Sequence, residues 1–179
     1  MPDRLWTIGH STHALDELAG LLARHGIEVL VDVRTVPRSR RHPHFASDAL
    51  ARSLPERGVE YRHASELGGF RRPRPDSPNG GWRNDAFRGY ADHALTEAFG
   101  RALGELCSVA RRRRTAAMCS EGLWWRCHRR LISDRLVVAG WEVCHIAPDG
   151  SVAPHELAEF ALPQPDGTVL YPPAQTSLL

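Results

Sequence analysis

Short apolar runs recur along the first 150 residues and predict the strands of a sheet. The run at 29–34, VLVDVR, stays apolar until Asp32, which is typical of a strand buried on both faces of a parallel sheet. The run at 115–119, TAAMC, has the same character, whereas the run at 59–64, VEYRHA, alternates like an edge strand. The predicted strands cover residues 4–9, 29–34, 59–64, 115–119 and 142–146.

Apolar residues at helical spacing separate these strands. Leu15 and Leu18 begin the apolar stripe of a helix that Gly26 ends. Ser47 is expected to cap a second helix, which Gly58 closes. The predicted helices cover residues 15–25, 47–57 and 87–109, with a break near Gly100 in the last, and a fourth begins at Cys127. Since strands that alternate with helices form parallel crossovers, we expect one three-layer α/β domain over residues 1–150. Its mainly parallel sheet should have about five strands flanked by helices.

Two segments lack such periodicity. Residues 65–85 are rich in glycine and proline and predict a long mobile loop over the carboxyl edge of the sheet. Trp82 is unusual there, because disordered linkers rarely carry an indole. Residues 151–179 predict a short helix at 155–160 and a proline-rich tail, either packed on the domain or trailing from it.

The composition is that of a globular protein, and the sequence also bears on the cellular compartment in which we expect the protein. With 179 residues, 42% of them hydrophobic, the chain is long enough for one domain with its own core. No apolar run approaches the roughly 18 residues that a membrane span needs, and the start lacks the pattern of a signal peptide. The four cysteines are not spaced like a secreted disulfide framework. We therefore expect a cytoplasmic protein without a membrane partner, and the sequence indicates no oligomeric state.

The kind of positive charge is more informative than its amount. The formal net charge of +2 does not by itself indicate a nucleic-acid partner. The 23 lysine and arginine positions are all arginine, the side chain suited to bidentate phosphate contacts and to stacking on bases. Arginines cluster in the loops at 38–41 and 71–74, where they could contact phosphates.

The stretch 115–130, TAAMCSEGLWWRCHRR, carries the densest candidate chemistry. A buried strand ends in the thiol of Cys119, the carboxylate of Glu121 follows, and a helical pattern begins at Cys127. A strand, a polar loop and a helix in this order place side chains in the crevice beyond the carboxyl end of a parallel sheet. The candidate site residues of this stretch are Cys119, Glu121, Trp124, Trp125, Cys127, His128 and Arg129.

Two other predicted strands are also followed by polar side chains. His10 and Ser11 come directly after the first strand, and Asp32 and Arg34 end the second. Because the carboxyl ends of parallel strands lie at one edge of a sheet, we expect these side chains to meet those near Glu121.

Together these motifs resemble the domain-of-unknown-function 488 family over about residues 5–147. The matching motifs are Thr7-Ile8-Gly9-His10-Ser11, Asp32-Val33-Arg34, Glu66-Leu67-Gly68-Gly69, Phe87 with Tyr90-Ala91, Cys119-x-Glu121 and Cys127-His128-Arg129. The resemblance implies a compact α/β fold and a shared site built from these positions, Tyr90 included, but no particular activity. Trp124 and Trp125 occupy a stretch where this family pattern leads us to expect a more polar loop.

The residues favour a hydrolase that acts on nucleic acid or a nucleotide and cleaves an N-glycosidic bond, as in base-excision DNA repair. Glu121 and Asp32 come from different strand ends and could form a pair of carboxylates. One carboxylate would activate water or stabilise an oxocarbenium-like transition state, and a neighbouring acid or His10 would protonate the leaving base. The expected catalytic residues are therefore Glu121, Asp32 and His10.

The same hypothesis assigns binding roles to aromatic and basic side chains. Indoles offer faces on which an extruded base can stack, and guanidinium groups can hold phosphates. The expected substrate-binding residues are Ser11, Arg34, Trp82, Tyr90, Cys119, Trp124, Trp125, Cys127, His128 and Arg129.

Two other functions remain open at this point, and a third is disfavoured. Cys119 could be the thiolate of a sulfurtransferase or redox protein, since nearby arginines and a helix N-terminus lower a thiol pKa. The same crevice could bind a nucleotide without catalysis. A zinc site is disfavoured because Cys119 and Cys127 are too far apart in sequence for a usual zinc pair, so we expect no metal and no cofactor. Asp32 could equally be an ion-pair partner of Arg34 or Arg129.

Overall fold

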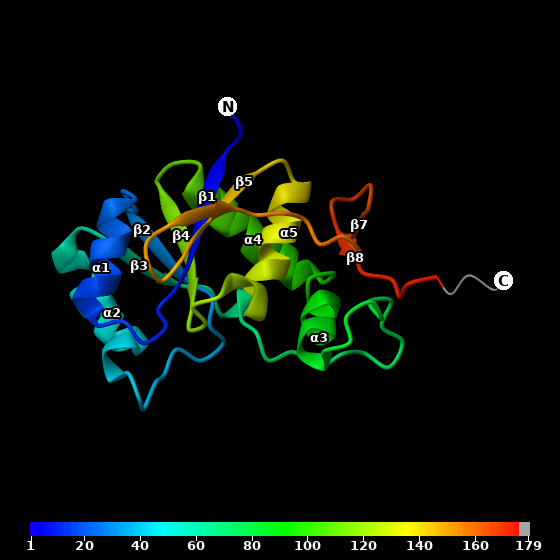
Figure 1. Cartoon of the computed structure of the whole chain (residues 1–179), viewed down its shortest axis with the longest axis horizontal. Helices are drawn as coiled ribbons and strands as arrows, with labels where there is room; N and C mark the ends of the chain where they lie inside the picture. Colours follow the sequence, from blue (N-terminus) through cyan, green and yellow to red (C-terminus); the bar gives the residue numbers. More distant parts are fainter. Residues whose placement is uncertain (176–179) are drawn as a thin grey trace.

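A six-stranded sheet forms the centre of the computed structural model, which describes residues 1–175 (Figure 1). The strands lie in the order β3-β2-β4-β1-β5-β6. The first five pair in parallel, and the last runs antiparallel to its neighbour, so the expected mainly parallel sheet is confirmed with one added edge strand. Their bounds are β1 (Arg4–Gly9), β2 (Val29–Asp32), β3 (Glu60–His63), β4 (Thr115–Cys119), β5 (Glu142–Ile146) and β6 (Val152–Pro154).

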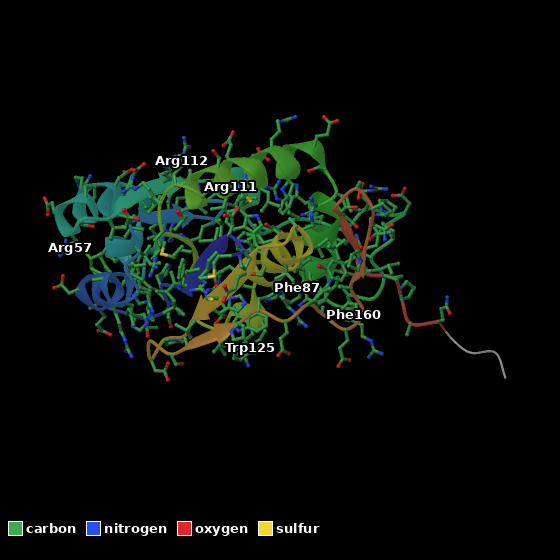
Figure 2. All side chains as sticks on the ribbon, turned by 90° about the horizontal axis from the view of Figure 1, so that it is seen from above. Arg57, Phe87, Arg111, Arg112, Trp125 and Phe160 are labelled. Atoms are coloured by element: carbon green, nitrogen blue, oxygen red, sulfur yellow. The ribbon has the colours of Figure 1, made fainter. Side chains whose placement is uncertain are left out.

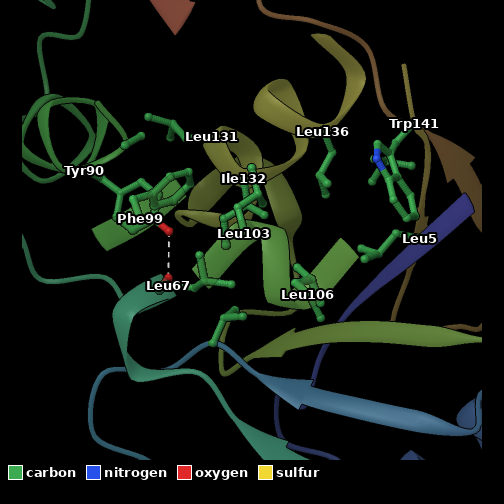
Figure 3. Packing of buried hydrophobic residues seen from close by; sticks show 14 of the residues in the cluster. Leu5, Leu67, Tyr90, Phe99, Leu103, Leu106, Leu131, Ile132, Leu136 and Trp141 are labelled. Carbon is green, nitrogen blue, oxygen red and sulfur yellow. Dashed lines mark hydrogen bonds between the residues drawn. The ribbon is translucent and has the colours of Figure 1, made fainter. Parts of the chain in front are cut away.

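Helices cover both faces of this sheet and complete three layers. The helices are α1 (Leu15–Arg24), α2 (Ser47–Ser53), α3 (Asp85–His93), α4 (Glu97–Ala110) and α5 (Arg129–Val138). Adjacent strand residues point to opposite faces. Leu5 thus joins the core beneath α3, α4 and α5, shown in Figure 3, whereas Trp6 joins the core beneath α1 and α2. The predicted single α/β domain is therefore correct.

Two predicted helices differ from the ranges that their apolar pattern indicated. The helix predicted over 87–109 is two helices, because the Asn84 side chain caps α3 and the Thr96 side chain caps α4. Gly100 lies inside α4 rather than at the break. The helix predicted over 47–57 stops at Ser53, and a short 3-10 turn follows through Arg57. Ser47 is the first helical residue and not the cap, which is Ala46.

The predicted helix at 155–160 is wrong. After β6 the chain continues in irregular conformation, because the side chain of His155 is held in a buried hydrogen-bond network instead of a helix surface. Two short strands, β7 (Leu162–Pro163) and β8 (Val169–Leu170), then pair at the end of the molecule opposite α1 and α2 (Figure 1). Val169 and Tyr171 join the core, so this segment packs on the domain.

The 65–85 segment is a loop as predicted, but the sheet and helices hold it at several points. Asn79 is fully buried, and its side chain donates to Asp92 of α3 and accepts from the backbone of Tyr171. Trp82 is 6% exposed and stacks on Phe87. Among residues 1–175, no helix has the length and apolar character that crossing a bilayer would require.

Candidate functional site

The carboxyl ends of β1, β2 and β4 meet at one edge of the sheet, as the parallel arrangement predicts. The backbone N–H of His10 donates to the carbonyl of Cys119 at 2.9 Å. Arg34 reaches across to His10, with 3.3 Å between Nη1 and Nε2. Side chains from near residues 10, 34 and 121 therefore line connected cavities at this edge.

Two adjoining cavities open at this edge. The aromatic pocket, of about 250 Å³, is lined by ring and thiol groups: Phe70, Phe87, Tyr90, Cys119, Cys127 and His128, with Asn84 and Arg126. The basic cleft, of about 660 Å³, is lined chiefly by His10, Ser11, Arg38, Arg40, Arg41 and His42. The residues that line both are Arg34, Thr35, Phe70, Ser120 and Glu121. The two cavities therefore adjoin along a shared wall that contains one carboxylate.

Asp32 lies beneath this wall in a closed ion pair. Its two carboxylate oxygens accept from Arg34 at 2.9 and 2.6 Å, and Oδ2 also accepts from the Tyr61 hydroxyl at 2.7 Å. Burial, followed by the charge of Asp32, raises the pKa of Tyr61, which keeps that hydroxyl protonated as a donor. Asp32 has no exposed surface. This geometry makes Asp32 the group that orients Arg34.

His10 is also buried, and both of its ring nitrogens have partners. Nδ1 donates to the carbonyl of Ser11 at 2.9 Å, so Nε2 accepts from Arg34, and the ring stacks on Phe45. Burial is the main cause that lowers its pKa to about 4, and the charge of Arg34 lowers it further. The imidazole is therefore neutral near pH 7, which makes it a poor acid for a leaving base.

Glu121 is the carboxylate on the wall between the two cavities. Its Oε1 accepts from the backbone N–H of Leu123 at 3.0 Å, which fixes the side chain in the loop after β4 while leaving it partly exposed. Among the described residues that line the two cavities, Glu121 is the sole carboxylate.

Gly9 allows the Glu121 loop to close against β1. A Cβ at Gly9 would lie 1.8 Å from the carbonyl oxygen of Glu121, which is far inside contact distance. We expect Gly9→Ala to lower the free energy of unfolding by about 1–3 kcal/mol and to displace Glu121, because the backbone must shift. Urea unfolding measures the effect. Gly100→Ala in α4, where an added Cβ meets nothing, is the matched control and should be neutral or stabilising; equal stability of the two variants would contradict the prediction.

Two thiols form the floor of the aromatic pocket. Cys119 Sγ and Cys127 Sγ lie 3.1 Å apart, and Cys127 Sγ accepts from Arg129 Nε at 3.2 Å. Burial alone would raise the pKa of Cys127. The hydrogen bond from Cys119 and the charge of Arg129 outweigh burial, so the pKa of Cys127 is lowered. Burial and the neighbouring Cys127 raise the pKa of Cys119.

Arg129, the first residue of α5, is fully buried behind these thiols. Its guanidinium also donates to the carbonyls of Glu121 and Gly122 and to the hydroxyl of Thr7, the last at 3.2 Å. Arg129 thus ties the Glu121 loop and the Cys127 thiol to β1, and it supports the site without lining a cavity.

A line of buried hydrogen bonds continues from Thr7 to Tyr171. Thr7 contacts His145 at 2.6 Å, His145 contacts His155 at 2.9 Å, and His155 contacts Asp134 at 2.7 Å. The Asp134 carboxylate accepts, so His155 Nε2 carries a proton. When His155 is neutral, its Nδ1 accepts from His145, whose own Nδ1 accepts from the Thr7 hydroxyl. Burial, and then His155 and Arg129, lower the pKa of His145, which is consistent with a neutral ring. Tyr171 donates to the other oxygen of Asp134 at 2.6 Å.

The three tryptophans that were expected to bind substrate lie outside both cavities. Trp82 is in the core, with the guanidinium of Arg130 over its ring at 5.0 Å. Trp124 stacks on His145 with ring centroids 4.2 Å apart. Trp125 is 47% exposed and projects at the surface (Figure 2). As placed, none of them offers a face to a base in the aromatic pocket, because packing partners distant in sequence occupy two of the rings.

Phe70 and Asn84 also line the aromatic pocket and were not identified from the sequence. Phe70 is 97% exposed at the wall between the two cavities and has a positive φ of 58°. Asn84 and Arg126 add an amide and a guanidinium to the aromatic pocket. Phe70 carried a signal in the sequence, since it is an aromatic residue directly after two glycines in a polar loop.

Histidine, cysteine and carboxylate side chains do not converge into a metal cluster in the described part of the chain. No group of three or more of them is arranged to hold an ion within residues 1–175. His128 Nε2 instead donates to the carbonyl of Val33 at 2.7 Å.

Comparison with known proteins gives one match. The family model described as "Domain of unknown function DUF488" matches residues 14–136. No curated protein and no solved structure matches the chain. The matched segment contains Asp32, Glu121 and both thiols of the aromatic pocket, but neither His10 nor His155.

Proposed function

The chain belongs to the DUF488 family, whose description names no reaction. From the geometry of the site, we propose that the protein hydrolyses an N-glycosidic bond in a nucleotide or nucleic acid. In this proposal Glu121 acts on the attacking water, the aromatic pocket receives the base, and the basic cleft receives the phosphates.

The observation that carries the proposal is the position of Glu121 between the two cavities. The aromatic pocket is near the lower end of small-molecule sites in size, which suits a single planar ring system. The ring of Tyr90 and that of Phe87 contribute to its apolar lining. The basic cleft presents Arg38, Arg40 and Arg41, side chains that contact phosphates well. A base in one cavity and a phosphate in the other would place the sugar beside the carboxylate.

The chemistry needs one carboxylate near the anomeric carbon. Glu121 would accept a proton as water attacks C1′, and its charge would stabilise the oxocarbenium-like transition state. The electron pair of the C–N bond leaves on the base nitrogen. Arg126 and the amide of Asn84, which line the same pocket, can donate hydrogen bonds to that base. Asp32 forms an ion pair with Arg34, and His10 accepts a hydrogen bond from it, so both act by holding Arg34 in position.

The test is release of a free base, followed by chromatography. The substrates are nucleosides, nucleoside monophosphates, and single-stranded and duplex oligonucleotides with normal or damaged bases. Base release by the intact chain supports the proposal. Binding of the same compounds without release would favour a nucleotide-binding module that uses the same two cavities.

Phe70 provides a separate test of nucleic-acid contact. Because its ring is almost wholly exposed at the wall between the cavities, stacking on a base is the contact it can offer. We expect Phe70→Ala to weaken binding of a single-stranded oligonucleotide by about 1–3 kcal/mol, and Phe70→Trp to retain it. Fluorescence anisotropy at low salt measures both. Thermal unfolding should not distinguish the variants from the parent, and unchanged affinity in Phe70→Ala would exclude the stacking role.

A further inference from the structure

The two thiols at the floor of the aromatic pocket are arranged for chemistry that hydrolysis does not use. Cys119 ends β4 and Cys127 precedes α5, so strand and helix hold the sulfur atoms 3.1 Å apart. Both cysteines are free. A disulfide bond of about 2.05 Å would need the two sulfurs to approach by only about 1 Å.

The buried guanidinium of Arg129 favours the anionic form of one of these sulfurs. In the described part of the chain, its guanidinium contacts Cys127 Sγ, the Thr7 hydroxyl and two backbone carbonyls, none of which is a carboxylate. A fully buried cation is costly unless a negative group compensates it. The Cys127 sulfur is the partner able to carry that charge. It also accepts from the backbone N–H of Arg129 at 3.4 Å, at the start of α5.

The two cysteines differ in a way that suits a nucleophile and a resolving thiol. The pKa of Cys127 is lowered by its Cys119 and Arg129 contacts despite burial, whereas burial and Cys127 raise that of Cys119. Both line the aromatic pocket, where Cys127 is partly exposed and Cys119 is buried. The remaining two cysteines, Cys107 and Cys144, do not line the aromatic pocket, and burial raises the pKa of each.

We propose that Cys127 and Cys119 are a redox pair that reduces a hydroperoxide. The thiolate of Cys127 attacks the terminal peroxide oxygen, the O–O bond breaks, and the departing oxygen takes a proton from solvent, equivalent to the one that Cys127 released on ionising, to leave as an alcohol or water. Cys127 is then a sulfenic acid. The Cys119 sulfur attacks the Cys127 sulfur, the S–S bond forms, and hydroxide leaves with the Cys119 proton as water. Two thiols and one hydroperoxide thus give one disulfide, one alcohol or water, and one further water. A small external dithiol restores both thiols by exchange.

This inference does not depend on the hydrolysis proposal, and its test uses no nucleotide. The reduced full-length protein is treated with one equivalent of hydrogen peroxide and mapped by mass spectrometry. We expect a single disulfide between Cys119 and Cys127, reversed by dithiothreitol. In Cys119→Ser, Cys127 should accumulate as a sulfenic acid that dimedone traps. Cys144→Ser is the matched control and should behave as the parent.

The nucleophile is identified by its reactivity at low pH. At pH 6 we expect Cys127 to react with iodoacetamide on the order of 10–100-fold faster than an ordinary cysteine, because its thiolate persists below the usual thiol pKa. Mapping on the parent protein measures this even where Cys127→Ser fails to fold. A disulfide that involves Cys107 or Cys144, or alkylation of Cys127 at the ordinary rate, would overturn the proposal.

Discussion

Replacement of Glu121 by glutamine is expected to reduce base release by about 10²–10⁴-fold, the contribution typical of a positioned acid or base. Glutamine keeps a carbonyl oxygen that can accept from the backbone N–H of Leu123, so the loop after β4 should retain its conformation. Only the capacity to take a proton and the negative charge are lost. No other described carboxylate lines either cavity, so none can substitute.

The measurement separates chemistry from binding. We expect the loss in kcat, with KM and the affinity for an uncleaved oligonucleotide nearly unchanged, since the aromatic pocket and the basic cleft keep their shape. Glu156→Gln, an exposed glutamate remote from both cavities, is the matched control. Full activity in Glu121→Gln would remove Glu121 from the mechanism and leave the hydrolysis proposal without a carboxylate.

Replacement of Arg129 by methionine should have the largest effect on stability. Methionine fills part of the space but leaves the carbonyls of Glu121 and Gly122 and the Thr7 hydroxyl without their donor, and the Cys127 thiolate without its cation. Removal of one partner from a buried charged pair costs about 3–5 kcal/mol. We expect a loss of that size in urea unfolding. Arg126→Met, at an exposed arginine three residues before Arg129, should change stability little.

The Arg129 variant should also change the pH dependence of stability. In the parent, the folded state lowers the pKa of Cys127, so the unfolded chain binds more protons. The ionised Cys127 therefore contributes its full stabilisation when the pH is above the thiol pKa of the unfolded chain. This contribution is lost as the pH falls through the lower pKa of Cys127 in the folded protein. Between these two values the free energy of unfolding should rise with pH in the parent and rise less in Arg129→Met. Parallel curves for the two proteins would show that Arg129 does not set the ionisation of Cys127.

Local pattern predicted the sheet and the place of the site well, for a physical reason. A strand buried on both faces is mostly apolar, and β1, β4 and β5 have the bounds that their runs indicated. Once the strands are parallel, the residues that follow them must share an edge. This was sufficient to expect Asp32, Arg34 and Glu121 near one another.

Contacts between distant segments were beyond that reasoning. Trp82 resembled a free stacking surface, but Phe87 and Tyr171 pack around it and close it off. The helical spacing at 155–160 was overridden because His155 is bonded to Asp134 across the fold. The approach of Cys127 to Cys119 depends on how the 120–128 loop folds back, which no periodicity records.

The line of hydrogen bonds from Asp134 to Thr7 makes the last part of the chain a component of the site. The carboxylate of Asp134 orients His155, His155 orients His145, and the line ends at Thr7, which accepts from Arg129. The family segment stops at residue 136, before both imidazoles and the phenol of Tyr171. A polypeptide truncated there would keep both thiols, Glu121 and Asp134 yet lose the two rings that connect Asp134 to Thr7, so the residues that orient Arg129 extend beyond the segment of sequence similarity.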